Sequence, residues 1–186
     1  MAARLMWLTH APTAGTRELV FGDDSGLAHP ELVRRWSERA VSCWRGPEPA
    51  CAESAEALGV VARLDPRLAN FDPGSWRGCS FAEVLSSSPT DLSAWLSDPA
   101  AAPHGGESLA DLVVRVGAFC DQTSWSDGPH LLVVAPMVAR AAAVHALGAP
   151  AEAIFRIDVA PLQRVTMSRS ADTWRLTGLG SSDPGT

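Results

Sequence analysis

The chain has 186 residues, of which 46% are hydrophobic and 19% are charged, and its formal net charge is −6. These values fit one soluble globular domain with a substantial core, and the negative charge argues against nucleic acid or an anionic membrane surface as the main partner. Every basic residue is an arginine. The absence of lysine excludes a Schiff-base lysine and with it pyridoxal phosphate, so we expect no cofactor.

The four cysteines and the N-terminus point to a cytoplasmic protein. The cysteines show no Cys-x-x-Cys spacing, so we expect reduced thiols and no metal site. The apolar run near the N-terminus is too short for a signal peptide or a membrane span. We therefore expect a cytoplasmic protein with no membrane partner.

Apolar runs and helical spacing alternate through the first part of the chain. Pro30 suits the first turn of a helix, and Gly59 is a residue type that commonly ends one. The predicted elements are a strand over 5–9, a helix over 30–41, a strand over 40–44, a helix over 50–58 and a strand over 60–64.

The second part begins with a loop over 65–78 that is rich in proline, glycine and aspartate. The predicted elements after it are helices over 80–85, 91–96 and 108–123, a strand over 131–135, a helix over 138–147, and strands over 163–168 and 173–177.

Strands that alternate with helices predict an α/β fold, a three-layer α/β/α sandwich with a mainly parallel sheet. We expect one domain over 1–178 and a flexible polar tail over 179–186. Ligands of such sheets bind beyond the carboxyl ends of the strands, which nominates the loops over 9–17 and 135–140.

Five segments carry further motifs, and their order and spacing matter more than any one of them. They are Leu8-Thr9-His10-Ala11-Pro12-Thr13, residues 51–58, Gly74-Ser75-Trp76-Arg77-Gly78, His104-Gly105-Gly106-Glu107-Ser108, and residues 133–140. Read in order, they resemble the Arg-His-Gly, Arg-Ala-x-Gln-Thr-Ala, Gly-x-Trp-Glu-Gly, Pro-Gly-Gly-Glu-Ser and Val-Ser-His-Gly-x-x-x-Arg motifs of the histidine phosphatase (phosphoglycerate mutase-like) superfamily. The resemblance covers nearly the whole chain and implies the fold of that family.

The resemblance also implies a phosphate site, of which this chain keeps little. In the family one histidine attacks phosphorus, two arginines and a second histidine hold the phosphoryl oxygens, and a carboxylic acid protonates the leaving oxygen. The nucleophile corresponds to His10. The first arginine is replaced by Thr9, the second by Ala50, the second histidine by Ala135, and the acid, at its nearest match, by Asn70.

Other candidate ligand contacts surround these positions. Thr9 and Thr13 could donate hydrogen bonds to a neutral ligand, and Arg17 lies beside the residue that corresponds to the family's phosphate-binding asparagine. Glu107 is retained, although in the family this residue mainly orders its loop. Ala135 and Met137 belong to an apolar corner that favours an apolar or aromatic ligand over a phosphate.

Threonine and alanine cannot replace the bidentate fork of arginine, so phosphatase turnover is expected to be very low. Arg17, Arg45 or Arg77 could rebuild the clamp, but each has a solvent-facing or salt-bridged role as its simpler interpretation. For His10 three roles stay open: acid/base or other catalysis, ligand contact alone, and a purely structural role.

The favoured prediction is a degenerate family member, repurposed as a small-molecule enzyme in specialised metabolism, that uses His10 as acid/base or to orient the ligand. Cyclisation, dehydration and isomerisation are the reactions considered. The alternatives are a phosphatase of small phosphorylated metabolites with a rebuilt phosphate site, and a non-catalytic pseudophosphatase that binds a ligand. The expected partner is a small-molecule substrate, and a homodimer is one possible assembly.

Overall fold

The structure is a computed structural model that describes residues 2–171 and 173–181. The strands are β1 Ala3–Thr9, β2 Ser42–Arg45, β3 Arg63–Leu64, β4 Gly128–Val134, β5 Gln163–Ser170 and β6 Thr173–Ser181. The helices are α1 Pro49–Leu58, α2 Phe81–Ser87, α3 Pro89–Ser97, α4 Leu109–Gln122 and α5 Pro136–Leu147.

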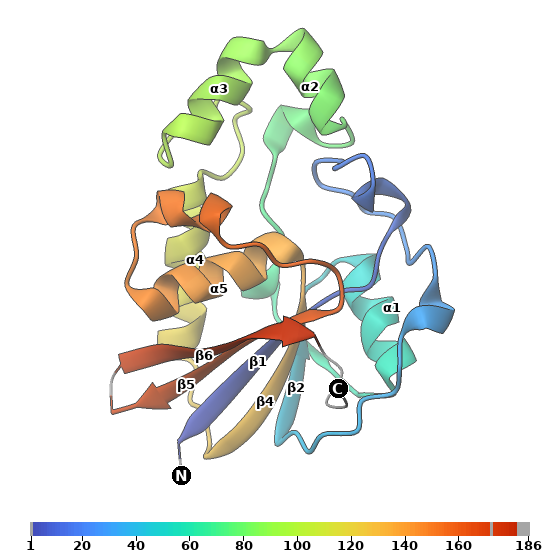
Figure 1. The fold of residues 1–186 in the computed structure, drawn as a ribbon, viewed down its shortest axis with the longest axis vertical. Helices are drawn as coiled ribbons and strands as arrows, with labels where there is room; N and C mark the ends of the chain where they lie inside the picture. The colour runs from blue at the N-terminus through green and yellow to red at the C-terminus, as the bar shows by residue number, and fades with distance from the viewer. Residues whose placement is uncertain (1, 172, 182–186) are drawn as a thin grey trace.

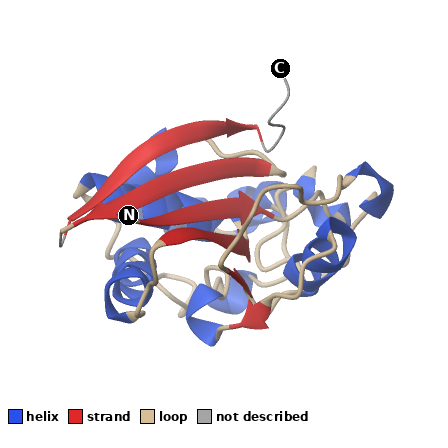
Figure 2. Cartoon of the chain, turned by 90° about the horizontal axis from the view of Figure 1, so that it is seen from below, coloured by secondary structure: helices blue, strands red, loops and turns tan. Residues whose placement is uncertain are grey.

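All six strands form one twisted sheet in the order β3-β2-β4-β1-β5-β6 (Figure 2). β3, β2, β4 and β1 are parallel, whereas β5 runs antiparallel to β1 and forms a hairpin with β6. The prediction of a mainly parallel sheet is therefore confirmed. The parallel arrangement brings the carboxyl ends of β1 and β4 side by side, because Thr9 pairs with Val134.

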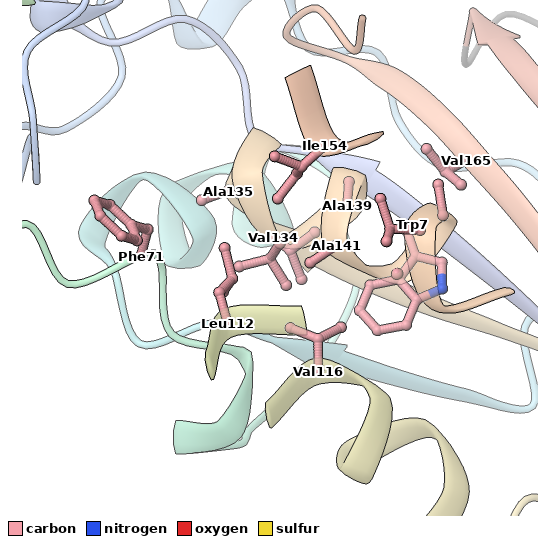
Figure 3. Packing of buried hydrophobic residues seen from close by; sticks show 14 of the residues in the cluster. Trp7, Phe71, Leu112, Val116, Val134, Ala135, Ala139, Ala141, Ile154 and Val165 are labelled. Carbon is pink, nitrogen blue, oxygen red and sulfur yellow. The ribbon is translucent and has the colours of Figure 1, made fainter. Parts of the chain in front are cut away.

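Helices cover both faces of the sheet, which gives three layers (Figure 1). Alternate residues of β1 point to opposite faces, as in any strand. Met6 and Leu8 pack with α1, whereas Leu5 and Trp7 pack with α4 and α5. Figure 3 shows the hydrophobic cluster that contains Trp7, whose ring lies over α4. The Trp7 and Phe119 rings meet edge-on, with their centroids 6.1 Å apart.

The short helices α2 and α3 lie away from the sheet, beyond α4 and α5 (Figure 1). α2 begins with a capping box, in which the Ser80 hydroxyl accepts from the Glu83 backbone N–H and the Glu83 carboxylate accepts from Ser80. Trp95 anchors α3 in the main core. These two helices therefore form a separate wall above the carboxyl end of the sheet.

Two predicted elements are much shorter in the structure than predicted. Within the predicted helix over 30–41, only Pro30–Leu32 form a helical turn, of the 3₁₀ type. The backbone N–H groups of Trp36 and Val41 donate instead to carbonyls of Leu58 and Pro129, so contacts with other elements replace the helix. The predicted strand over 60–64 shrinks to the two residues of β3.

The C-terminal strand is longer than predicted. β6 continues to Ser181, so residues 179–181 of the predicted tail belong to a strand, and residues 182–186 lie outside the described residues. Within the described part of the chain, no helix combines the length and the apolar character that crossing a membrane requires.

Candidate active site

A cavity of about 530 Å³ opens beyond the carboxyl ends of β1 and β4. Both loops that the sequence nominates contribute to it. Its lining residues are His10, Thr13, Gly15, Thr16, Leu19, Val20, Phe21, Gly22, Asp23, Asn70, Phe71, Phe81, Trp95, Leu96, Pro136, Met137, Arg140, Phe155, Asp158, Val159, Ala160 and Pro161. Cavities of this size commonly hold small organic ligands.

His10 lies in the cavity wall with its ring held in one orientation. Its backbone N–H donates to the Val134 carbonyl at 2.9 Å, which fixes the residue directly after β1 against the end of β4. Its Nδ1 lies 2.8 Å from the Ala11 carbonyl oxygen. A carbonyl oxygen only accepts, so Nδ1 carries the proton and Nε2 of the neutral ring keeps a free lone pair. The ring is thus arranged as a nucleophile or a base.

The loop after His10 is ordered by a carboxylate. Asp23 Oδ2 accepts from the Thr13 hydroxyl and from the Gly15 N–H, and Oδ1 accepts from the Ser25 N–H. Burial alone would raise the pKa of Asp23, but the hydrogen bonds from Ser25, Thr13 and Gly15 outweigh it and lower the pKa below its ordinary value. Asp23 is therefore ionised at neutral pH and is a poor proton donor.

On the opposite side of His10, α5 begins at Pro136. The helix has 12 residues, and its N-terminal end carries the positive end of the helix dipole. Arg140, one turn further along, lines the same cavity and pairs with Asp158 at 3.2 Å. Because the Asp158 side chain is 97% exposed, the free energy of this ion pair is small. A bound phosphoryl group can therefore compete with Asp158 for the Arg140 guanidinium.

Part of the cavity wall is aromatic. The rings belong to four segments: the loop after β1 supplies Phe21, α2 Phe81, α3 Trp95 and the turn Ala151–Arg156 Phe155. The Trp95 ring meets Phe21 and Phe155 edge-on, with centroid distances of 5.7 and 5.2 Å. Their sequence positions carry no motif, and Trp95 reads as an ordinary core residue. The sequence alone therefore does not reveal this wall.

The structure brings four of the predicted site residues to the cavity. They are His10, Thr13, Asn70 and Met137. Asn70 Oδ1 accepts from the Phe71 backbone N–H, and the Asn70 backbone N–H donates to the Glu48 carboxylate.

The other four predicted site residues do not line the cavity. The Thr9 hydroxyl is fully buried and donates to the Ala160 carbonyl at 2.7 Å, and Ala135 is fully buried as the residue before α5 (Figure 3). Arg17 is exposed. Glu107 forms a bidentate ion pair with Arg115, at 2.7 and 2.8 Å. The positions that the resemblance assigns to charged phosphate contacts are thus apolar or used for structure.

Arg115 also organises the segment that carries Asn70. Its guanidinium donates to the carbonyls of Arg67 and Ala69 at 2.7 and 2.9 Å, in addition to its pair with Glu107. Arg115→Ala would leave a poorly solvated carboxylate and two carbonyls without their donor. We expect the free energy of unfolding in urea to fall by about 2–3 kcal/mol. Arg39→Ala, at an exposed arginine, is the control; an equal loss in both variants would contradict this role.

His104 packs against Phe71 in the cavity wall, and its ionisation makes the stability of the fold depend on pH. Its ring packs edge-on against Phe71 at 5.2 Å, and its Nδ1 accepts from the Gly106 N–H at 3.0 Å. Burial lowers the pKa of His104, and the Asp72 carboxylate only partly offsets this effect. Nε2 is buried and has no hydrogen-bond partner among the described residues.

Because the pKa of His104 is lower in the folded state, the unfolded chain binds its proton first as the pH falls through about 6.5. The stability that the neutral ring provides is complete above that pH and is lost as the pH falls toward the folded-state pKa. We expect the urea midpoint to decrease from pH 7.5 to pH 5.5, with a smaller decrease in His104→Asn. Equal decreases in both proteins would show that another group is responsible.

Comparison with known proteins identifies the family to which the chain belongs. A model of the histidine phosphatase superfamily (branch 1) matches residues 50–182, and the chain belongs to this family. The sequence is similar to glucosyl-3-phosphoglycerate phosphatase of Mycobacterium tuberculosis, with 40% identity over 60 residues, 32% of this chain and 27% of that protein. The enzyme of the same name from Mycolicibacterium vanbaalenii is 33% identical over 103 residues, 50% of this chain and 46% of that protein. The matches thus span between a quarter and a half of these relatives.

Solved structures share the fold over nearly the whole chain. A mycobacterial glucosyl-3-phosphoglycerate phosphatase superposes with a TM-score of 0.77 and 24% identity, covering 96% of this chain and 99% of that one. The alpha-ribazole phosphatase from Shigella flexneri gives a TM-score of 0.79 and 16% identity, covering 98% of both chains. At these identities the likeness establishes the fold.

The relatives correct the functional prediction. Because the proteins to which the chain is similar are phosphatases, the favoured prediction of a repurposed, non-phosphatase enzyme is wrong, and its phosphatase alternative is better supported. The comparisons give no support to a pseudophosphatase or to a role in specialised metabolism. The prediction weighed the charges lost at the family's positions. It did not weigh the anchored ring of His10, or Arg140 and the start of α5 in the same cavity.

Proposed function

We propose that the chain hydrolyses phosphate monoesters of small metabolites and that His10 is the nucleophile. The observation that carries this proposal is the hydrogen bond from His10 Nδ1 to the Ala11 carbonyl, which leaves the Nε2 lone pair available in a cavity of substrate size. Membership of the histidine phosphatase superfamily supports the same reaction.

The reaction proceeds in two displacements. The Nε2 lone pair attacks phosphorus, the bond between phosphorus and the ester oxygen breaks, and its electron pair leaves with that oxygen, which takes a proton from water. A water molecule then attacks the phosphorylated His10 and releases inorganic phosphate together with the neutral ring. During both steps the Nδ1 hydrogen bond to Ala11 stabilises the positive charge that develops on the ring.

Phosphate contacts in this site are fewer than the resemblance implies. Arg140 and the N-terminal end of α5 supply positive charge on one side of His10. Thr9, Ala50 and Ala135 are buried and supply none. Because each lost donor typically costs about 10²–10³ in rate and such losses are not simply additive in free energy, we propose a slow phosphatase.

This proposal predicts a strong dependence on the leaving group. Asp23 is a poor acid, so the departing oxygen depends on its own low basicity. We expect p-nitrophenyl phosphate to be hydrolysed at least about tenfold faster than phenyl phosphate, whose leaving group is also aromatic but more basic, in keeping with a missing general acid. Phosphate release measured with both esters checks this. No release from either ester, or equal rates, would contradict the proposal.

Two further expectations remain proposals. We propose a cytoplasmic location, and a homodimer as one assembly that sedimentation measurements can test.

A further inference from the structure

We propose that the natural substrate is a phosphate monoester whose organic part is an uncharged aromatic group, bound by the aromatic wall of the cavity that His10 also lines. This inference rests on the proposed function, because it places the phosphoryl group at His10. Four observations carry it: the aromatic rings of the wall, the exposure of apolar side chains at the cavity, its volume, and the sign of its charges.

The aromatic rings form one continuous surface rather than isolated contacts. Trp95 meets Phe155 and Phe21 edge-on, and Phe21 stacks on Phe81 with a centroid distance of 6.3 Å and an interplanar angle of 24°. Phe71, on the same side, is tilted against Trp95 at 5.5 Å. Rings in offset and edge-on arrangements are the environment in which a further aromatic ring is most strongly bound.

Several apolar side chains around this cavity are exposed. Leu19 is 65% exposed and Phe155 is 39% exposed, and both line the cavity together with the partly exposed Leu96. Exposed apolar side chains gathered around one concavity mark binding sites more often than chance exposure does. An apolar ligand would cover them.

The cavity is also larger than the reaction needs. Its volume is about 530 Å³, whereas the phosphoryl group occupies only the end beside His10 and Arg140. The remaining space, lined by Phe21, Trp95 and Phe155, is left for the organic part of the ester.

The charges of the cavity disfavour an anionic organic part. Asp23 and Asp158 both line it, and the guanidinium of Arg140, the arginine among the residues that line it, is assigned to the phosphoryl group. A neighbouring cavity of about 310 Å³ that shares Asp23 is lined by three further carboxylates, those of Asp24, Glu48 and Asp72. One guanidinium, that of Arg77, lines it too and already pairs with Asp24 and Asp72, so negative charge predominates there. A carboxylate or a second phosphate on the organic part would be repelled there.

The test compares esters of primary alcohols, so that the leaving groups have similar basicity. We expect kcat/KM for 2-naphthylmethyl phosphate to exceed that for glycerol 3-phosphate by at least tenfold, and 3-phosphoglycerate to be the poorest of the three. Equal values for the first two, or a preference for 3-phosphoglycerate, would overturn the proposal.

Phe155→Ala tests the wall itself. Phe155 is partly exposed, so its truncation spares the core. The ratio of kcat/KM for 2-naphthylmethyl phosphate to that for glycerol 3-phosphate should fall about tenfold, the size of effect expected when one aromatic contact and its buried area are removed. Leu147→Ala, at an exposed residue outside the cavity, is the matched control and should leave the ratio unchanged. An unchanged ratio in Phe155→Ala would overturn the assignment.

A binding measurement separates this inference from the proposed function. 2-Naphthylmethylphosphonate cannot be hydrolysed, and its binding can be followed by calorimetry. If no ester is hydrolysed but the phosphonate binds and Phe155→Ala weakens it about tenfold, the proposed function fails and the aromatic site stands. If esters are hydrolysed but the phosphonate binds no better than methylphosphonate, the function stands and the aromatic site is wrong.

Discussion

Replacing His10 by alanine should reduce phosphate release from p-nitrophenyl phosphate by about 10³-fold or more, since removing a catalytic nucleophile eliminates the covalent route altogether. The remaining cavity would still bind the ester through Arg140 and the aromatic wall. We therefore expect the loss in kcat, with a much smaller change in KM. Steady-state phosphate release over a range of ester concentrations separates the two.

Arg17→Ala is the control for His10→Ala. Arg17 lies in the same loop but is exposed and does not line the cavity, so its removal should leave kcat and KM within about twofold. Thermal melting of both variants shows whether each remains folded. Wild-type turnover in His10→Ala would show that phosphate release does not pass through this ring.

Arg140→Ala should lower kcat/KM for p-nitrophenyl phosphate by about 10²-fold, the usual cost of one charged donor at a developing oxyanion. Among the residues described at the cavity, Arg140 is the arginine that can approach a phosphoryl group bound at His10. For Arg140→Lys, kcat/KM should lie between the values of the wild type and Arg140→Ala, because lysine keeps the charge but lacks the bidentate fork.

Asp158→Asn is the companion of Arg140→Ala. It removes the partner of Arg140, so KM for p-nitrophenyl phosphate should decrease by about two- to fivefold, in keeping with the small free energy of an exposed ion pair. If Arg140→Ala retains full kcat/KM, Arg140 does not contact the phosphoryl group, and the positive charge at this site comes from α5 alone.

Much of the fold follows from the sequence because local and tertiary preferences agree. α1 ends where Gly59 adopts a φ of +74°, and α5 ends in the same way at Gly148. α4 is capped at its N-terminus by Ser108, whose hydroxyl accepts from the Asp111 N–H. Each boundary depends on one or two neighbouring residues, so it can be predicted without the rest of the chain.

The segment over 30–41 shows where such prediction fails. Its spacing fits a helix, and Val33 and Trp36 do pack on the side of the sheet that α1 covers. Its backbone, however, bonds to Leu58 and to Pro129, which are distant in sequence. A residue pattern within the segment cannot reveal these partners, because they become available only once the sheet has formed.

The candidate site likewise contains residues that could be predicted from the sequence and residues that could not. His10 and the loops at 9–17 and 135–140 could be nominated from strand ends, because parallel strands deliver their carboxyl ends to one edge. The aromatic wall could not, since its rings come from four segments that are distant in sequence and meet only in the folded chain, namely Phe21, Phe81, Trp95 and Phe155. The roles of Thr9 and Glu107 also depend on distant partners, Ala160 and Arg115.

The most direct test of the proposed function is to look for the covalent intermediate. The protein is mixed with p-nitrophenyl phosphate, quenched in alkali within milliseconds to seconds, digested and analysed by mass spectrometry. The account predicts a phosphoryl group on His10 that survives alkali, is lost in acid, and is absent from His10→Ala. Phosphate release with no phosphorylation of His10 at any quench time, or a phosphoryl group on another residue, would contradict it.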